Sequence, residues 1–413
     1  MTTLGSIDDT PKGWKVVKLG DICKQIKSGG TPLTTKREYW NGNIPFVKIE
    51  DITSSGKYLT KTNTFISENG LKNSNAWIVP KNSLLLAMYG SLGEVSINKI
   101  PAATNQAILG IMPNDTIDIE FLYYWFLYFK KQWKKFAKPT TQANLTAEIV
   151  KNTKLPLPPL PEQKAIAKIL STVDEAIQKV DEAIAKTERL KKGLMQKLLT
   201  KGIGHKEFKY SKELGCEIPR EWEVTKLKDV IRYKKGKKPK IMIEEQKEGY
   251  LPYLTADNLR TGVFTQWARE DEDVVKVDKN DIILIWDGFY CGFTFRGFEG
   301  ILSSTMVKVE PRPGINENFL FYVLKTHFRE LNTKISGMYL KHVNKTVFEN
   351  LKIPLPPLSE QQKIAEILST VDKKLELERK RKEKLERIKK GLMNDLLTGR
   401  KRVNVEKILN SDG

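Results

Sequence analysis

The sequence predicts an α+β protein in which two similar α/β domains are separated by two long, antiparallel coiled-coil helices. Three observations predict this fold. A stretch of 46 residues occurs twice, the regions before the two copies share a weaker similarity, and both copies space their apolar residues as coiled coils do. A chain of 413 residues is long enough for two or three domains with sizeable cores.

The repeated stretch covers residues 155–200 and returns at 353–398. Of the 46 aligned positions, 26 are identical. Identity at this level indicates a tandem duplication, with one copy of the stretch closing each half of the chain.

Each copy is expected to form one long helix behind a proline-rich stop. Proline lacks an N–H and keeps its predecessor out of the α region, so residues 155–159 and 353–357 should be extended. Pro161 suits a first helical turn, and Ser359 followed by Gln362 has the spacing of a capping box. About 38 residues at roughly 1.5 Å each would give a rod of about 57 Å. The apolar seam consists of Ile166, Leu170, Val173, Ile177, Val180 and Ile184, and of Ile364, Leu368, Val371, Leu375, Leu385, Leu392 and Leu396.

The middles of the two helices differ, while their flanks match. Residues 174–185 carry one lysine and four acids, a net charge of −3, whereas residues 372–383 carry six basic residues and four acids, a net charge of +2. Antiparallel helices would bring these middles together, with the charges setting the register. Two solvated helix faces would carry the same charges, and both interpretations remain open at this point.

The duplication extends to the regions before the helices. Gly29–Pro32 aligns with Gly236–Pro239, and Asn82–Gly90 aligns with Asn280–Gly288. Short β-type runs bounded by Gly, Asn and Pro dominate both regions, followed by helical runs at Ile119–Phe136 and Glu317–Leu331. The predicted organisation is a first α/β domain at 1–154, a long helix at 155–200, a second α/β domain at 201–352 (with a connection at 201–220), a second long helix at 353–400 and a mobile tail at 401–413.

Composition restricts the partners and the compartment. A net charge of +20 and a pI near 9.5 favour a polyanionic partner such as nucleic acid. Three scattered cysteines form no disulfide framework, which fits a reducing cytoplasm. The N-terminus lacks the apolar core of a signal peptide, and the apolar run Phe121–Phe129 is too short to span a bilayer. We therefore expect a cytoplasmic protein without a membrane segment.

The sequence contains no recognisable catalytic motif. It has no GxxxxGK[ST] phosphate loop, no GxGxxG after a strand and no GxSxG elbow, and its three histidines lack metal-ligand spacing. We expect no metal site, no catalytic residue and no cofactor in this chain, although the acidic signatures of nucleases are too weak to exclude one.

Loops after the predicted strands carry amides, hydroxyls and aromatic rings beside Lys and Arg. Such groups read base edges, whereas lysines mostly hold phosphates. The candidate DNA-binding residues of the first domain are Thr31, Lys48, Tyr89, Ser91, Thr104, Asn105, Gln106, Thr140, Thr141, Gln142 and Asn144. Those of the second domain are Lys235, Lys237, Lys238, Trp286, Asp287, Tyr290, Ser303, Ser304, Thr305, Tyr339 and Lys341. Any of them can instead be an ordinary polar loop residue, and Tyr89 and Trp286 suit a core as well as a contact.

Four motifs carry a family resemblance: Gly29-Gly-Thr-Pro32, Ile44-Pro-Phe46, Thr104-Asn105-Gln106 and the repeated Leu-Pro-Leu-Pro-Pro-Leu-x-Glu-Gln. With them the whole chain resembles the specificity subunit of type I restriction–modification enzymes. The resemblance implies that residues 1–154 and 201–352 are target-recognition domains, each of which reads one half of a bipartite DNA site in the major groove. It also implies that the helices act as a spacer and hold two methyltransferase (modification) subunits. Those partners would supply S-adenosylmethionine chemistry, and restriction subunits would supply ATP- and Mg-dependent translocation and cleavage.

The motifs of the second domain depart from the pattern, with Gly236-Lys-Lys-Pro239 and Ser303-Ser304-Thr305, so its contact residues are less firmly assigned. The flanks of the helices are kept in both copies and are predicted to face the modification subunits, packing between the helices being the other explanation. The candidate partner-binding residues are Pro158, Pro159, Glu162, Gln163, Leu170, Leu194, Met195, Pro356, Pro357, Glu360, Gln361, Leu368, Leu392 and Met393.

The sequence therefore predicts a non-catalytic DNA-recognition subunit of a prokaryotic, cytoplasmic type I restriction–modification complex. Two other classes stay open. One is a self-contained DNA-modifying or DNA-cleaving enzyme with unrecognised motifs, and the other is a coiled-coil scaffold that binds only protein.

Overall fold

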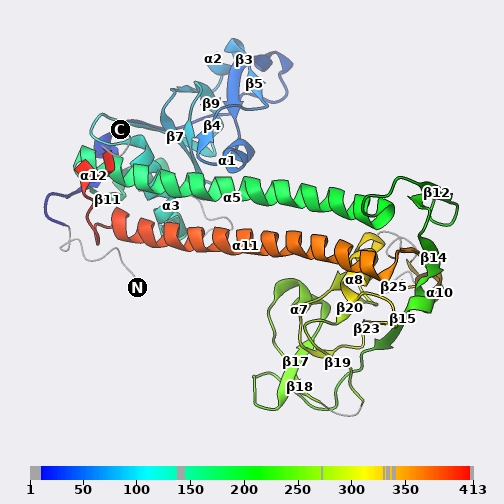
Figure 1. Cartoon of the computed structure of the whole chain (residues 1–413). Coiled ribbons are helices and arrows are strands. Elements are labelled where there is room, and N and C mark those ends of the chain that lie inside the picture. The colour runs from blue at the N-terminus through cyan, green and yellow to red at the C-terminus, as the bar shows by residue number, and fades with distance from the viewer. Residues whose placement is uncertain are drawn as a thin grey trace. The chain divides into compact units, whose positions relative to one another are not determined.

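The computed structural model describes residues 11–136, 145–270, 273–328, 331, 335–336 and 341–409. The chain divides into two compact units, unit 1 (residues 1–181 and 380–413) and unit 2 (residues 182–379). Two long helices, α5 (Leu160–Lys201) and α11 (Leu358–Leu397), each begin in one unit and end in the other (Figure 1). Each unit therefore consists of one α/β domain and a half of each long helix.

Unit 1 contains three sheets. A five-stranded sheet has the order β2-β10-β7-β8-β4, a four-stranded sheet has the order β5-β3-β9-β6, and β1 pairs with β11. Its strands are β1 (Lys15–Lys18), β2 (Cys23–Ser28), β3 (Trp40–Val47), β4 (Tyr58–Leu59), β5 (Phe65–Ile66), β6 (Ile78–Val79), β7 (Ser83–Ala87), β8 (Val95–Asn98), β9 (Ala102–Thr104), β10 (Ile108–Pro113) and β11 (Lys154–Leu157). Its shorter helices are η2 (Leu19–Ile22), η3 (Arg37–Tyr39), α1 (Ile49–Ser55), α2 (Glu68–Lys72), α3 (Ile119–Phe136), α4 (Ala147–Asn152) and α12 (Val405–Leu409).

Unit 2 repeats this plan. Its main sheets have the orders β15-β23-β20-β21 and β16-β18-β17-β22-β19, and two-stranded pairs join β14 to β26, β12 to β13 and β24 to β25. Its strands are β12 (Phe208–Ser211), β13 (Cys216–Pro219), β14 (Glu223–Lys226), β15 (Ile231–Lys235), β16 (Met242–Ile243), β17 (Tyr250–Leu254), β18 (Trp267–Arg269), β19 (Lys276–Val277), β20 (Ile282–Ile285), β21 (Thr294–Phe295), β22 (Gly300–Leu302), β23 (Met306–Pro311), β24 (Ile335–Ser336), β25 (His342–Val343) and β26 (Lys352–Leu355). Its shorter helices are α6 (Leu227–Val230), α7 (Ala256–Thr261), α8 (Glu317–Thr326) and α10 (Lys345–Asn350).

Strand register confirms the duplication. The unusual parallel pair β3–β9 in unit 1 has its counterpart in the parallel pair β17–β22 in unit 2. The proline-rich segments pair in the same way, with Pro156 opposite Val16 and Pro354 opposite Val224. These segments form two-stranded ladders because proline is tolerated at a sheet edge, where its missing N–H removes no interior bond.

A large aromatic core lies against the sheet β2-β10-β7-β8-β4 in unit 1 and against the sheet β15-β23-β20-β21 in unit 2. In unit 1 the apolar run of α3 is buried, with Trp125, Phe126 and Phe129 almost fully covered and stacked around Trp133. The same core includes residues from both long helices, among them Leu170 and Leu396. In the described part of the chain, no helix combines the length and the apolar character that a bilayer crossing requires.

Within each unit the two long helices run antiparallel, and ion pairs link them within or close to their oppositely charged middles. In unit 1, Asp181 lies 2.7 Å from Lys382, and in unit 2, Glu188 lies 2.7 Å from Arg379. The seam residues Leu170, Val180, Ile364, Leu368, Leu375 and Leu396 are buried. The interpretation of the charged middles as paired rather than solvated faces is therefore the one that the structure supports.

The predictions for Ser359 and for the tail need correction, and the structure adds detail to the connection. Helix α11 begins at Leu358, so Ser359 lies inside its first turn and does not cap it; the backbone carbonyl of Pro357 accepts from Glu360 N and Gln361 N instead. The connection at 201–220 contains the β12–β13 hairpin. The tail is anchored as far as residue 409, since α12 receives a 2.9 Å hydrogen bond from Lys168 Nζ at the Ile408 carbonyl.

Candidate nucleic-acid interface

Three loops of unit 1 meet at one end of its five-stranded sheet. Strand β10 is antiparallel to both of its neighbours, with Leu109 opposite Ser28 and Ile108 opposite Ala87. The end of β2, the end of β7 and the start of β10 are therefore adjacent. This register brings the loop after β2, the turn between β7 and β8 and the loop between β9 and β10 to the same place, and these loops carry the Gly-Gly-Thr-Pro, Tyr-Gly-Ser and Thr-Asn-Gln motifs.

Unit 2 brings the equivalent loops together by the same register. Lys235 at the end of β15 lies opposite Val307, and Ile285 at the end of β20 lies opposite Met306 at the start of β23. Lys341 joins this sheet end because its backbone carbonyl accepts a 2.7 Å hydrogen bond from Gly288 N. Most of the predicted DNA-binding residues of unit 2 therefore lie on one set of neighbouring loops. We call each set of loops a sheet-end surface. The sheet-end surface of unit 1 consists of residues 29–32, 88–93 and 104–107, and that of unit 2 consists of residues 236–239, 286–292 and 303–305.

Glycine is required where these loops cross. A Cβ on Gly29 would lie 1.9 Å from the carbonyl oxygen of Thr104, and one on Gly236 would lie 2.2 Å from that of Ser303. Such distances are far inside van der Waals contact, so the loops approach one another this closely only with glycine. The glycines of the two motifs are therefore part of the frame, and their neighbours are the candidates for contact.

In the sheet-end surface of unit 1, the exposed side chains Thr31 and Gln106 are in direct contact. Thr31 Oγ1 donates to Gln106 Oε1 at 2.5 Å, which leaves the amide of Gln106 as a donor toward the surface. Asn105 Oδ1 accepts from Ala107 N at 3.0 Å, so Asn105 shapes the loop. Thr104 is fully buried, and a base contact by its side chain is not supported. Tyr89, Ser91 and Lys48 are partly exposed and stay predictions, with Tyr89 also packed against the core.

In unit 2 the structure separates frame residues from exposed ones. Trp286 stacks on Tyr233 at 5.5 Å and meets Phe348 edge to face at 5.2 Å, so it belongs to the core. Ser303 is buried and bonds to Thr305 at 2.8 Å. The residues of this set that remain accessible are Lys235, Lys237, Lys238, Asp287, Tyr290, Ser304, Thr305 and Lys341.

Two of the accessible lysines form ion pairs. Lys235 Nζ lies 2.8 Å from Asp287, and Lys237 Nζ lies 3.3 Å from Asp273. Both pairs are largely exposed and hold the lysines weakly. The predicted residues Thr140, Thr141, Gln142, Asn144 and Tyr339 lie outside the described part of the chain.

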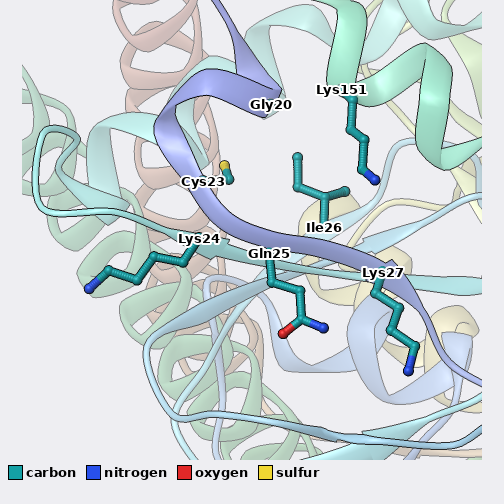
Figure 2. Close-up of a pocket in the computed structure, with 7 residues that line it drawn as sticks. All are labelled: Gly20, Cys23, Lys24, Gln25, Ile26, Lys27 and Lys151. Atoms are coloured by element: carbon teal, nitrogen blue, oxygen red, sulfur yellow. The ribbon is translucent and has the colours of Figure 1, made fainter.

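A hollow of about 510 Å³ runs along β2 in unit 1 (Figure 2). Its lining consists of Gly20, Cys23, Lys24, Gln25, Ile26, Lys27 and Lys151. In Figure 2, Lys151 and Ile26 lie on one side of the β2 ribbon, and Lys24, Gln25 and Lys27 extend on the other. Burial raises the pKa of the Cys23 thiol to about 12, so the thiol is protonated. The converging loops begin where β2 ends, whereas the hollow runs along β2 itself. The hollow is therefore not part of the sheet-end surface.

The predicted partner-binding pair Glu162 and Gln163 is buried and bonded within unit 1. Glu162 accepts from Trp14 Nε1 at 3.0 Å and from Arg402 at 2.7 and 2.9 Å. The Gln163 side chain accepts from Asp118 N at 2.7 Å, directly before α3. The pair therefore fastens the first strand, the tail and the start of α3 to the long helix.

Unit 2 contains the same arrangement. Glu360 accepts from Trp222 Nε1 at 2.9 Å and lies 2.8 Å from His205 Nε2. Gln361 accepts from Asn316 N at 2.8 Å, directly before α8. We call these two pairs the Glu–Gln latches. Because their polar atoms are occupied inside the units, the prediction that they contact a partner is not supported.

A second repeated contact explains the matching helix flanks, and it was not predicted. In unit 1, Asp174 accepts from Tyr124 Oη at 2.8 Å and pairs with Lys389 at 2.5 Å. In unit 2, Asp372 accepts from Tyr322 Oη at 2.8 Å and pairs with Lys191. We call these the first and second triads. Each joins the aspartate of one Ile-Leu-Ser-Thr-Val-Asp to the first lysine of the other Lys-Lys-Gly-Leu-Met, so packing within the chain accounts for these two charged positions of the motifs.

Burial is the main reason that the pKa of Tyr124 is raised, so this hydroxyl is protonated and donates to Asp174. Beside it, Lys57 Nζ lies 2.9 Å from Glu120. Burial alone would raise the pKa of Glu120, but hydrogen bonds from Tyr58 and Lys57 lower it overall. The carboxylate of Glu120 is thus held in its charged form against α5.

Other predicted partner residues divide by exposure. Leu170 and Leu368 are in the cores, Pro158 and Pro356 are buried, and Leu194, Met195, Leu392 and Met393 pack partly against the cores. Pro159 and Pro357 are exposed. Among the residues that the structure describes, no group of three or more His, Cys, Asp or Glu side chains is placed to hold a metal ion.

These features define a class of protein: two copies of one α/β domain, each with three loops gathered at a sheet end, connected by two long helices. Residues 11–188 and 219–387 each match the type I restriction modification DNA specificity domain. The chain belongs to this family, as the resemblance in its motifs indicated, and it is a specificity subunit whose role is DNA sequence recognition.

Individual proteins agree with this assignment. The chain is 32% identical over 419 residues to a putative type I restriction enzyme MjaX specificity subunit of Methanocaldococcus jannaschii, covering 96% of each. It is 44% identical over 195 residues to the MjaVIII specificity subunit of the same organism, covering 47% of this chain and 46% of that protein. The crystal structure of an S subunit from M. genitalium has the same fold, with a TM-score of 0.61 at 18% identity over 96% of this chain and 99% of that one.

Proposed function

We propose that each unit reads one half of a bipartite DNA site with its sheet-end surface, and that the chain performs no chemistry itself. The observation that carries this proposal is the repetition of the surface. In both units the same strand register gathers the same three loops over a glycine crossing, yet the exposed side chains differ. A shared backbone arrangement with different exposed side chains is what two domains that recognise different DNA sequences would require.

The charge of the chain supports DNA as the ligand. The net charge of +20 provides phosphate contacts, and Lys235, Lys237, Lys238 and Lys341 are exposed on the sheet-end surface of unit 2 or directly beside it. The amide of Gln106 and the hydroxyls of Ser91, Ser304 and Thr305 are groups that read base edges. We assign the lysines to phosphates and the polar side chains to bases.

The long helices are proposed to set the distance between the two half-sites. Each passes without a break from one unit to the other, and no proline follows its first turn. In each unit the antiparallel register is fixed by a triad and by ion pairs between the charged middles. A continuous helix of fixed register transmits a change in its length directly to a change in spacing.

Two modification subunits are proposed to bind exposed positions that both helices keep. Gly193 and Gly391 are exposed within their helices, and a Cβ at either would meet nothing within 4 Å. Glycine costs a helix interior about 1 kcal/mol relative to alanine, and among the described residues none packs closely enough to either position to require glycine there. Next to them Leu190 and Ile388 are 54% and 42% exposed. A partner that approaches the helix backbone closely would explain why both copies keep the glycine and the apolar neighbour.

Under this proposal the partners supply the chemistry. The modification subunits would bind S-adenosylmethionine and methylate the site, and restriction subunits, where present, would use ATP and Mg²⁺ to translocate and cut. The purified chain, alone and with the modification subunits, also tests the two other function classes, the self-contained DNA enzyme and the protein-binding scaffold. Turnover of DNA by the purified chain with S-adenosylmethionine and Mg²⁺ would support a self-contained enzyme, and a lack of DNA binding even with the modification subunits would support a scaffold.

Genome-wide methylation mapping of host cells with and without this chain tests the proposal. We expect one split sequence motif to lose its methylation when the chain is removed. A variant with the exposed pair changed, Thr31→Ala with Gln106→Ala, should alter one half of the motif and leave the other half intact. Methylation that is independent of the chain, or a change in both halves, would overturn the proposal.

A further inference from the structure

Phe289 is the most exposed of the large hydrophobic side chains in the described part of the chain, at 76%. It was not singled out from the sequence. It lies in the turn between β20 and β21, within the sheet-end surface of unit 2, between Gly288 and Gly292. Both glycines have positive φ, 102° and 87°, which glycine adopts without strain. The turn thus has a backbone shape that only these residues permit easily, and it holds a phenyl ring in solvent.

The turn is fixed at both ends. Gly288 N donates to the Lys341 carbonyl at 2.7 Å, and Gly292 N donates to the Ile285 carbonyl at 2.8 Å. Behind the turn, Phe293 packs on Phe328 with 4.1 Å between ring centroids. The exposure of Phe289 is therefore a property of a tethered loop.

Cations surround the exposed ring. Lys341 Nζ lies 5.6 Å from the centre of the Phe289 ring, and Arg260 lies 5.4 Å from the ring of Tyr290, which meets Phe289 edge to face at 5.1 Å. The positive charge beside the ring is not complementary to an apolar protein surface. It is complementary to a polyanion that also exposes apolar groups, and duplex DNA is such a ligand.

Unit 1 has the same turn without the ring. Ala87 N donates to the Glu94 carbonyl and Gly93 N to the Ala87 carbonyl, as Ile285 N does to Phe293 and Gly292 N to Ile285. Between these anchors unit 1 has the five residues 88–92 and unit 2 has the six residues 286–291. The position after the first glycine is the partly exposed Ser91 in unit 1 and the exposed Phe289 in unit 2. The two turns share their anchoring hydrogen bonds and this glycine but differ in length and in their other side chains, and the exposed phenyl ring belongs to unit 2.

We propose that Phe289 is a specificity-determining residue that packs on the methyl group of a thymine in the second half-site. The inference rests on the proposed function and names one contact of it. In the major groove the thymine C5 methyl is the apolar group that the base pairs present, and phenyl rings are among its recognised partners. Lys341 and Lys235, which lie beside the sheet-end surface, hold the flanking phosphates while the ring contacts the base.

The test uses the chain assembled with its modification subunits and duplexes that carry the mapped split motif. Each thymine of the second half-site is replaced in turn by deoxyuridine, which removes only the methyl group. For the wild-type complex we expect one replacement to weaken binding about 3- to 10-fold, as loss of one buried methyl group would. The Phe289→Ala complex should bind the thymine duplex with a similar loss and should not respond to that replacement.

Two further variants sharpen the result. Phe289→Leu keeps an apolar side chain and should keep part of the methyl dependence. Tyr210→Ala removes another exposed ring of unit 2, 65% exposed on the β12–β13 hairpin, and should leave both affinity and methyl dependence unchanged. An unchanged deoxyuridine profile in Phe289→Ala, equal loss on unrelated DNA, or a second half-site without thymine would overturn the inference. Absence of any chain-dependent motif would instead overturn the proposed function.

Discussion

Asp174 and Asp181 offer a matched pair for testing why the two helices keep their flanks. Both carboxylates project from α5 in unit 1, seven residues or about two turns apart, and both pair with a lysine of α11. Asp174 and Lys389 are 27% and 22% exposed and share Tyr124, whereas Asp181 and Lys382 are 46% and 34% exposed. The Asp174 pair is in a flank that both copies keep, and the Asp181 pair is in the variable middle.

Asp174→Asn keeps the shape of the side chain but removes its charge. The asparagine oxygen can replace only one of the two accepting oxygens of Asp174. The asparagine NH₂ group then faces either the Tyr124 hydroxyl or the Lys389 ammonium, and the hydrogen bond from that group is lost. Hydrogen bonds to charged groups contribute about 1.5–3 kcal/mol each when partly buried, so we expect this substitution to lower the free energy of unfolding by about 2–3 kcal/mol. Asp181→Asn breaks a largely exposed pair and should cost less than about 1 kcal/mol. Asp372→Asn should reproduce the larger cost through the second triad.

Urea unfolding of the purified chain measures these differences. Because two units can unfold in separate transitions, the shift of the first transition is compared between variants rather than a single global value. A double-mutant cycle of Asp174→Asn with Lys389→Met isolates the pair, and we expect a coupling of about 1–2 kcal/mol. Equal shifts for Asp174→Asn and Asp181→Asn, or a coupling near zero, would refute the conclusion that chain-internal packing explains the matching flanks.

Three other outcomes follow from the same structure. Inserting seven residues into both helix middles adds about 10 Å of helix and should lengthen the tolerated gap by about three base pairs without altering either half-site; altered half-sites in methylation maps would contradict the spacer role. Lys237→Ala and Lys238→Ala should each reduce the salt slope of DNA binding by about 0.9 if these lysines hold phosphates, and an unchanged slope would remove them from the interface. Burial raises the pKa of Cys23 to about 12, above the ordinary thiol value of about 8.5, so at pH 8 the folded chain should alkylate at Cys23 at least about 100-fold more slowly than the unfolded chain. The same raised pKa contributes stability below pH 8.5 that is lost as the pH rises toward 12, and rapid labelling at pH 8 would contradict the burial.

Most of the architecture was accessible from the sequence because it is periodic and repeated. Helix α3 covers Ile119–Phe136 as the apolar run predicted. Helix α8 covers Glu317–Thr326 of the run predicted to end at Leu331, and Phe328 and Leu331 are also helical, while residues 329–330 lie outside the described part of the chain. The proline-rich segments were expected to be extended, and they are, but their pairing with β1 and β14 depends on partners about 140 residues earlier in the chain. Sequence patterns carry no direct information on such distant pairing.

The candidate sites were harder to predict because residue type does not reveal exposure. Thr104 and Ser303 have the chemistry of base readers but are buried under the crossing loops, and Trp286 is a core residue. The Glu–Gln latches show a second limit of sequence-based prediction, which concerns repeated residues. Identity between the copies suggested an external partner, yet Glu162 and Glu360 are each bonded to a tryptophan of their own unit. Repetition alone cannot distinguish a surface kept for a partner from a contact kept for folding.

The two units also indicate how such a protein can change its target without losing its fold. The positions that cannot vary are in the frame, where Gly29 and Gly236 leave no room for a Cβ and the latch residues Glu162, Gln163 and Gln361 are buried. The positions that differ, Ser91 against Phe289 and Thr31 against Lys238, are on the accessible loops above it. Exposed loop substitutions usually change stability by less than about 0.5 kcal/mol, so the readers can change at little cost to folding. Under the proposed function, a new specificity then requires only new side chains on a sheet end, and the duplicated frame provides two such ends that vary independently.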